Sequence, residues 1–163
     1  MSGANSSRER HVGTPEEMTP AGPPTGAHKD PRLGMKVTHR RYVPYSHAHY
    51  GGNLVEGAYS LGLFGDVATE LCIRTDGDEG LLASYDDVQF VAPVQAGDVI
   101  EVTAIVTRVG RRSRGVAFEA RVVCRARPEK SPSAAEVLDP PIVVTRATGT
   151  VVVPGESSMV RTE

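Results

Sequence analysis

Residues 53–71 read NLVEGAYSLGLFGDVATEL, and this stretch breaks the strand-like pattern of the chain. Small or apolar side chains recur there every three to four positions, which places them on one face of an α-helix. They are Leu54, Ala58, Leu61, Gly65, Ala68 and, just past the stretch, Cys72. Asn53 is a favourable N-cap, so we expect a helix of about 18 residues and about 27 Å to start there. Gly57, Gly62 and Gly65 each cost roughly 1 kcal/mol of helix propensity, which suggests that another segment packs very close.

The sequence on both sides of this helix is typical of β-strands. Apolar and polar residues alternate over residues 98–109, and residues 114–126 repeat the alternation after the turn GRRS. Further strands are expected at 36–43, 81–91 and 142–153. One strand, a long helix and four more strands predict an α+β domain in which an antiparallel five-stranded sheet wraps around one long central helix, the hotdog fold. Prolines bound residues 128–141, which we expect to form a surface loop.

The length of 163 residues suits one domain rather than two. We expect a disordered Pro- and Gly-rich arm over residues 1–34, the hotdog domain over 35–154 and a flexible C-terminal tail over 155–163. Docking of the arm on a neighbouring subunit is the alternative to disorder.

Charge and hydropathy exclude several classes of function. The net charge of −2 provides no positive field for nucleic acid. No apolar run approaches the roughly 20 residues that cross a bilayer, and the first ten residues lack a signal-peptide core, so we expect a soluble, cytoplasmic protein. Cys72 and Cys124 lie far apart without metal-ligand spacing and are expected to be small core residues.

One face of the expected helix carries acidic residues. At 100° per residue Tyr59, Asp66 and Glu70 lie close together, away from the apolar stripe. Two carboxylates one turn apart raise the pKa of one member, which leaves a base and an acid near neutral pH. The alternative is a solvated helix face on which Glu70 pairs with Arg74.

The loop SHAHYGG, residues 46–52, brings His49 and Tyr50 next to the expected start of the helix. Gly51, Gly52 and the free N–H groups of the first turn are suited to hold an oxygen that becomes anionic. The His-x-His pattern lacks a third ligand, so no metal site is expected.

Arginines gather around the GRRS turn and are candidates for binding phosphate groups. They are Arg108, Arg111, Arg112 and Arg114. The alternative is a charged hairpin tip that serves solubility alone. Arg146 lies within an apolar strand, where it either pairs with a carboxylate or lines a subunit interface.

Five stretches together resemble the small hotdog-fold ammonia-lyases that act on 3-aminoacyl-CoA thioesters, the β-alanyl-CoA and 3-aminobutyryl-CoA ammonia-lyases. The stretches are HAHYGGNLVEGA, GDVATEL, SYDDVQFVAPVQAGD, VTRVGRRSRGVAFEARVV and PPIVVTRATG. The resemblance covers residues 36–153. The APVQAGD turn also occurs in hotdog thioesterases and hydratases, so it supports the fold and the acyl-CoA class rather than the reaction.

The resemblance implies reversible addition of ammonia to an enoyl-CoA. We expect Asp66 or Glu70 to remove the α-proton and the other to hold the ammonium group, with His49 and Tyr50 as a proton relay. The substrate and its thioester oxygen are expected to meet Gly51, Gly52, Asn53, Leu54 and Tyr59. The four hairpin arginines would bind the CoA phosphates. No cofactor beyond the substrate's CoA is implied, and the family suggests a homodimer or a hexamer of three dimers.

Two other classes of function stay open on the sequence alone. One is an acyl-CoA thioesterase or enoyl-CoA hydratase, in which Asn53 and Asp66 would orient and activate water. The other is an acyl-CoA binding module without catalysis.

Overall fold

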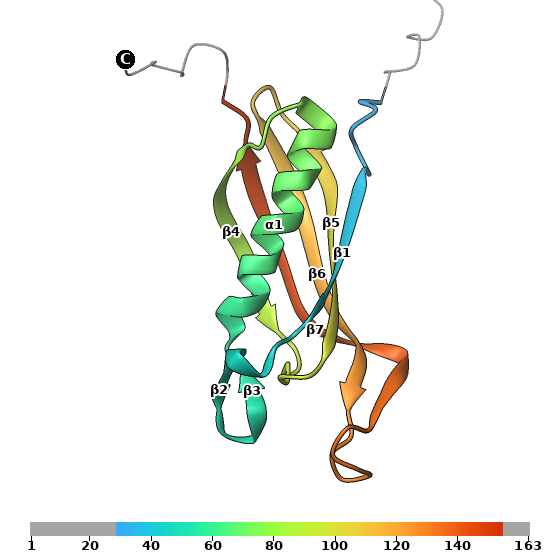
Figure 1. Ribbon diagram of the computed structural model, residues 1–163. Helices are drawn as coiled ribbons and strands as arrows, with labels where there is room; N and C mark the ends of the chain where they lie inside the picture. Colours follow the sequence, from blue (N-terminus) through green and yellow to red (C-terminus); the bar gives the residue numbers. More distant parts are fainter. Residues whose placement is uncertain (1–28, 155–163) are drawn as a thin grey trace, which may run out of the picture.

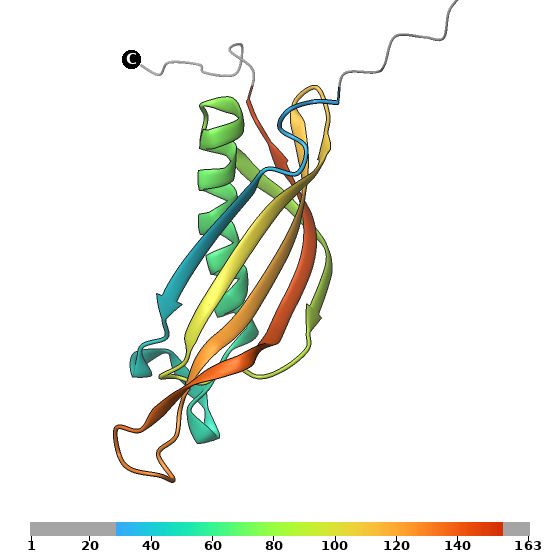
Figure 2. The same cartoon turned by 90° about the vertical axis from the view of Figure 1, so that its right-hand side faces the viewer.

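The computed structural model describes residues 29–154, and in it one antiparallel sheet carries one long helix across a face (Figure 1). The helix α1 spans Gly57–Asp76. The sheet order is β1-β5-β6-β7-β4. Its strands are β1 Lys36–Tyr42, β4 Leu81–Phe90, β5 Val99–Val109, β6 Ser113–Ala126 and β7 Ala135–Val152. Figure 2 shows the sheet curving around α1 while its other face stays uncovered. The predicted hotdog fold is confirmed.

The core lies between α1 and the concave face of the sheet. The alternation in β5 is confirmed, because Ile100, Val102 and Val106 are all buried. From the helix, Phe64 stacks on Phe118 of β6 with ring centroids 5.0 Å apart. Within residues 29–154, no helix combines the length and the apolar character that crossing a bilayer requires.

The start of the helix differs from the expectation. Glu56 rather than Asn53 is the N-cap residue, and α1 runs on to Asp76. Asn53 has a φ of 59° and ends the short 3-10 turn Gly51–Asn53, where its carbonyl accepts a 2.8 Å hydrogen bond from Ala96 N–H. The next two residues form the strand β3, Leu54–Val55, in place of the expected first helical turn.

The buried face of α1 is also rotated from the expected stripe. Ala68 and Cys72 are buried as expected, whereas Ala58 is exposed and Leu61 is half-buried. The other buried residues of the helix are Ser60, Leu63, Phe64, Val67 and Leu71. The spacing identified a helix correctly but centred its apolar face on smaller residues than those that fill the core.

The predicted loop 128–141 is shorter in the structure, since β7 begins at Ala135. Val122 pairs with Ile142, but Cys124 pairs with Val137, so the intervening residues of β7 bulge out of the ladder. Pro140 lies in this bulge, where the sheet needs no backbone N–H group.

Residues 29–34, which the sequence assigned to the arm, belong to the folded domain. Gly34 N–H donates to Val106 O at 2.9 Å, and Arg32 donates to Asp76 at the end of α1 at 2.8 Å. The rest of that predicted arm and the predicted C-terminal tail lie outside the described residues.

A buried ion pair joins the end of α1 to the β5–β6 hairpin. The side chains of Arg114 and Asp76 are only 4% and 8% exposed, and Arg114 contacts both Asp76 carboxylate oxygens. Arg114 Nη1 also donates to the carbonyls of Gly110 and Ser113 at 2.7 and 2.8 Å. Burial raises the pKa of Asp76, but hydrogen bonds from Arg114, Thr75 and Arg32 outweigh it and hold the pKa below its usual value.

The uncovered face of the sheet carries paired charges. Arg146 Nε donates to Glu119 at 2.9 Å, and Arg40 donates to Glu101 at 2.8 Å. Of the two roles open for Arg146, pairing with a carboxylate is therefore present within the chain.

Candidate active site

A hollow of about 440 Å³ opens at the start of α1. The ribbon of β2, Ala48–Tyr50, and β3 forms one side of it, and the segment that follows β4 forms another. Val55 N–H donates to Val94 O at 2.9 Å, which ties the ribbon to that segment just before the helix begins. This tertiary hydrogen bond holds residues 54–55 extended and so sets where α1 starts.

Polar groups without partners face this hollow. Gly57, which lines the hollow, and Ala58 are the first two residues of α1, so their N–H groups have no acceptor inside the helix. Ser60 and Thr145 also line the hollow, and each is only 2% exposed. Neither hydroxyl is hydrogen-bonded within residues 29–154, and no fully buried side-chain oxygen there lacks a partner, so both hydroxyl oxygens keep some accessible surface. The start of the helix therefore offers several donors to a bound oxygen.

The hollow has an acidic and aromatic rim. Glu56 is the single charged residue among those that line it within residues 29–154, and its side chain does not cap the helix. Tyr50 and Phe90 are 57% and 58% exposed. A Cβ on Gly57 would lie 2.6 Å from Phe90 Cε1, so this glycine lets the ring lie against the start of the helix. The close packing expected at the helix glycines occurs here, whereas Gly62 and Gly65 face open space.

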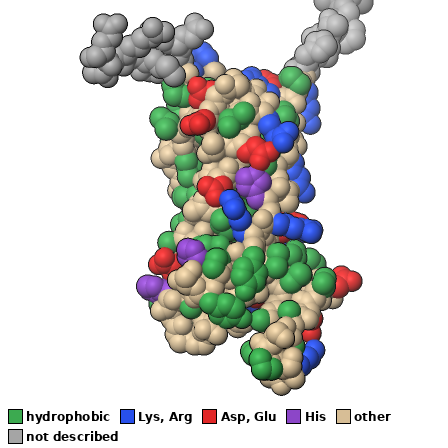
Figure 3. Space-filling model, viewed as in Figure 1, with side chains coloured by type: hydrophobic (Ala, Val, Ile, Leu, Met, Phe, Trp, Pro, Cys, Tyr) green, Lys and Arg blue, Asp and Glu red, His purple; other side chains and the backbone are tan. Residues whose placement is uncertain are grey.

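Figure 3 shows apolar side chains gathered over the lower end of the molecule, around the β2–β3 ribbon and the start of α1. Tyr42 and Tyr45 are each 56% exposed. An acyl-chain site at this end would therefore have apolar surroundings.

Asp66 and Glu70 lie farther along the helix. At 1.5 Å per residue they are about 15 and 21 Å from Glu56 along the helix axis. Asp66 is 55% exposed, and its carboxylate lies 3.8 Å from Arg41. In one chain, then, the expected carboxylate pair is separate from the start of the helix.

Glu70 is engaged on both carboxylate oxygens. His39 Nε2 lies 2.5 Å from Oε2, and Arg74 Nε donates to Oε1 at 2.7 Å. These hydrogen bonds, His39 first and Arg74 second, hold the pKa of Glu70 below its usual value. The expected rise from like charges is therefore wrong for Glu70, and the alternative ion pair with Arg74 is present. His39 was missed because only the β1–α1 packing brings it to the helix.

The loop residues divide between two places. Tyr50 lines the hollow. The His49 ring packs edge-on against the Tyr50 ring, with the two centroids 4.5 Å apart. His47 packs instead on Tyr59, whose pKa is raised chiefly by burial. Gly51, Gly52, Asn53 and Leu54 lie in the β2–β3 ribbon rather than in the helix.

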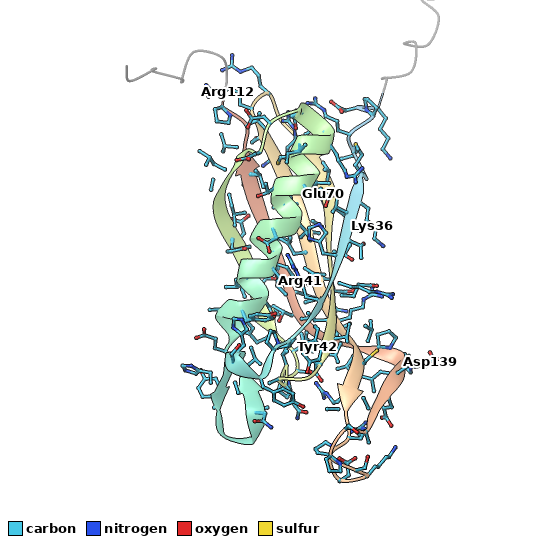
Figure 4. The ribbon with its side chains drawn as sticks, viewed as in Figure 1. Lys36, Arg41, Tyr42, Glu70, Arg112 and Asp139 are labelled. Atoms are coloured by element: carbon cyan, nitrogen blue, oxygen red, sulfur yellow. The ribbon has the colours of Figure 1, made fainter. Side chains whose placement is uncertain are left out.

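The hairpin arginines lie at the opposite end of the molecule from the hollow. Arg114 pairs with Asp76, the last residue of α1, and Arg112 is at the top of Figure 4. The 20 residues of α1 put about 30 Å between this tip and the start of the helix. Arg108, Arg111 and Arg112 are exposed, whereas Arg114 is buried in its ion pair and does not share their surface.

The residues of the hollow that the sequence did not assign to a site include Glu56, Ser60, Phe90 and Thr145. Starting the helix at Asn53 placed Glu56 within its first turn and hid its position at the edge of the site. The sequence signal that could have found it is the short β-prone pair Leu54–Val55 directly before it.

The chain is similar to several known proteins. Residues 52–123 match the model of the Thioesterase superfamily. The 3-aminobutyryl-CoA ammonia lyase of Acetoanaerobium sticklandii is 60% identical over 107 residues, which make up 66% of this chain and 85% of that enzyme. The structure of β-alanyl-CoA:ammonia lyase from Clostridium propionicum matches with a TM-score of 0.70 and 36% identity, over 74% of this chain and 86% of that one.

A hexameric hotdog fold thioesterase of Campylobacter jejuni also matches, with a TM-score of 0.59 and 22% identity over 78% of this chain and 84% of that one. At this identity the likeness concerns the fold alone. The two relatives with higher identity are both named as ammonia lyases of CoA thioesters, and most of each is covered. The chain therefore belongs to the hotdog-fold family of the 3-aminobutyryl-CoA and β-alanyl-CoA ammonia lyases.

Proposed function

We propose that the protein reversibly removes ammonia from a 3-aminoacyl-CoA thioester and leaves an enoyl-CoA. The observation that carries this proposal is the hollow at the start of α1, where free helix N–H groups, two hydroxyls and one carboxylate line the same space. The 60% identity to a 3-aminobutyryl-CoA ammonia lyase supports this substrate class, and β-alanyl-CoA is the second candidate substrate. CoA enters as part of the substrate.

Elimination requires that negative charge on the thioester oxygen be stabilised while the α-proton leaves. The N–H groups of Gly57 and Ala58 are suited to donate to that oxygen, and the Ser60 hydroxyl lies one turn further along. Gly57 and Ala58 replace Gly52 and Asn53 in this role, because the N-cap lies three residues later than expected.

Asp66 and Glu70 stay proposed proton carriers, with His49 as a relay through Tyr50. At about 15 and 21 Å from Glu56 along one helix, the two carboxylates would act on a thioester held by a second copy of the chain. The exposed hairpin arginines, about 30 Å away, would likewise bind the CoA phosphates of a partner's substrate.

A homodimer is therefore the smallest assembly that we propose, with a hexamer of three dimers as the larger form. Strand β4 lies at one edge of the sheet, and Leu81 and Leu82 on it are 65% and 37% exposed. Such an edge presents backbone groups that a second copy can pair. Light scattering after size-exclusion chromatography measures the mass, and a monomer at working concentration would contradict this assembly.

The activity is tested by mixing the protein with crotonyl-CoA or acryloyl-CoA and ammonium at mildly alkaline pH. Loss of enoyl-thioester absorbance that requires ammonium and releases no thiol is the expected result. Release of free thiol would instead identify a thioesterase, and loss without ammonium or thiol would identify a hydratase. No reaction with either thioester would contradict the proposed substrates and favour a binding module.

A further inference from the structure

The rim of the hollow has the chemistry of a cation site. Glu56 supplies its only charge among the described lining residues, and no Lys, Arg or His joins it there. None of the ion pairs within residues 29–154 includes Glu56. The carboxylate is thus left without a protein cation beside a space large enough for a ligand.

Two exposed aromatic rings accompany this carboxylate. More than half of the surface of both Tyr50 and Phe90 is exposed, although each is a large apolar residue. Phe90 lies against the backbone of Gly57, the residue that follows Glu56. The faces of aromatic rings attract ammonium groups within about 6 Å.

The hydroxyls of two largely buried residues independently indicate a ligand. Ser60 and Thr145 are each 2% exposed and line the same hollow. With the free N–H groups of Gly57 and Ala58, they suit the oxygen of a thioester. The hollow therefore separates into donors for an oxygen at the helix start and an acidic, aromatic rim for a cation.

We propose that Glu56, with the rings of Tyr50 and Phe90, binds the β-ammonium group of the substrate and selects 3-aminoacyl thioesters over neutral ones. This inference rests on the proposed function and deepens it by naming the group that recognises the amine. It also separates cation binding from Asp66 and Glu70, to which the sequence assigned it. In the reverse direction the same rim binds the incoming ammonium ion.

Kinetics with varied ammonium tests the role of Glu56. In Glu56→Gln the KM for ammonium should rise about tenfold or more, because the neutral amide keeps the shape but loses the charge. The KM for crotonyl-CoA, which carries no amine, should stay within about threefold of wild type. Glu79→Gln is the matched control, since Glu79 is an exposed carboxylate beyond the far end of α1 and should change neither constant.

Binding without turnover keeps the test independent of rate. The thioether S-(3-aminobutyl)-CoA has no carbonyl and cannot eliminate ammonia, and S-butyl-CoA is its uncharged counterpart. Calorimetry should show that wild type prefers the ammonium-bearing thioether by about tenfold and that Glu56→Gln loses this preference. Equal preference in the two proteins would overturn the inference.

Phe90→Leu tests the aromatic contribution while it keeps apolar contact with Gly57. The KM for ammonium should rise about fivefold. A change in oligomer mass with an unchanged KM for ammonium would mean that the ring serves a subunit contact, which overturns its assignment here. If the wild-type protein shows no ammonium-dependent turnover, the proposed function is contradicted. If the wild type is active and Glu56→Gln has the same KM for ammonium, only the present inference is contradicted.

Discussion

Replacing Arg114 by Met should be among the most destabilising single changes in the domain. The side chains of Arg114 and Asp76 are 4% and 8% exposed, and the substitution removes both contacts of Arg114 to the carboxylate and two to hairpin carbonyls. Asp76 would retain hydrogen bonds from Arg32 and Thr75 only. Breaking a buried ion pair from one side costs about 3–5 kcal/mol, because a charge stays buried with too few partners.

Urea denaturation at a fixed protein concentration measures this cost. With an m-value of about 2 kcal/mol/M, the midpoint should fall by about 2 M. Arg111→Met is the control, since Arg111 is exposed on the same hairpin. This substitution should change the free energy of unfolding by no more than about 0.5 kcal/mol. Adding Asp76→Asn to Arg114→Met should recover part of the stability, because the buried carboxylate charge is then removed as well.

The ion pair also predicts how stability depends on pH. The depressed pKa of Asp76 adds stability above the unfolded pKa of about 3.9, and this is lost as pH falls through the folded pKa. Arg114→Met should therefore show a shallower loss below about pH 4 than wild type. A midpoint shift equal to that of Arg111→Met, or an unchanged acid profile, would refute the reasoning.

Three further changes have defined outcomes. Asp66→Asn should keep the free energy of unfolding within about 0.5 kcal/mol of wild type, because the side chain is 55% exposed. The same variant should abolish ammonia release, and a wild-type rate would remove Asp66 from the mechanism. His39→Gln should raise the pKa of Glu70 back toward that of an unperturbed carboxyl, which carboxyl NMR titration measures. An unchanged pKa would contradict the role of the imidazole. Gly149→Ala should lower the free energy of unfolding by about 1–3 kcal/mol, since the added Cβ would lie 2.5 Å from the backbone oxygen of Ser84. Thermal unfolding measures this loss, and an unchanged stability would show that β4 and β7 can move apart at little cost.

The strands could be predicted well because their signal is local. Residues 98–109 were expected and β5 spans Val99–Val109, while residues 114–126 were expected and β6 spans Ser113–Ala126. A half-buried strand repeats every two residues, so neighbouring positions already report both the element and its inward face.

The start of the helix could not be predicted in this way. Asn53 is locally a good N-cap, but its carbonyl and the N–H of Val55 bond to the segment after β4. These tertiary hydrogen bonds delay the helix to Gly57 and place Glu56 at the edge of the hollow. Spacing along one helix likewise placed Asp66 and Glu70 on a common face, but it carried no information on the contact of Glu70 with His39.

By itself, the sequence determined the hotdog fold and the ammonia-lyase family, because periodicity and motifs lie within contiguous stretches of chain. Only the tertiary structure decided which polar groups share a site. Phe90 lies against Gly57, and Arg114 pairs with Asp76, although more than thirty residues separate each pair along the chain. Spacing rules hold within one element, whereas these contacts depend on how α1 crosses the sheet and on which hydrogen bonds fix its ends.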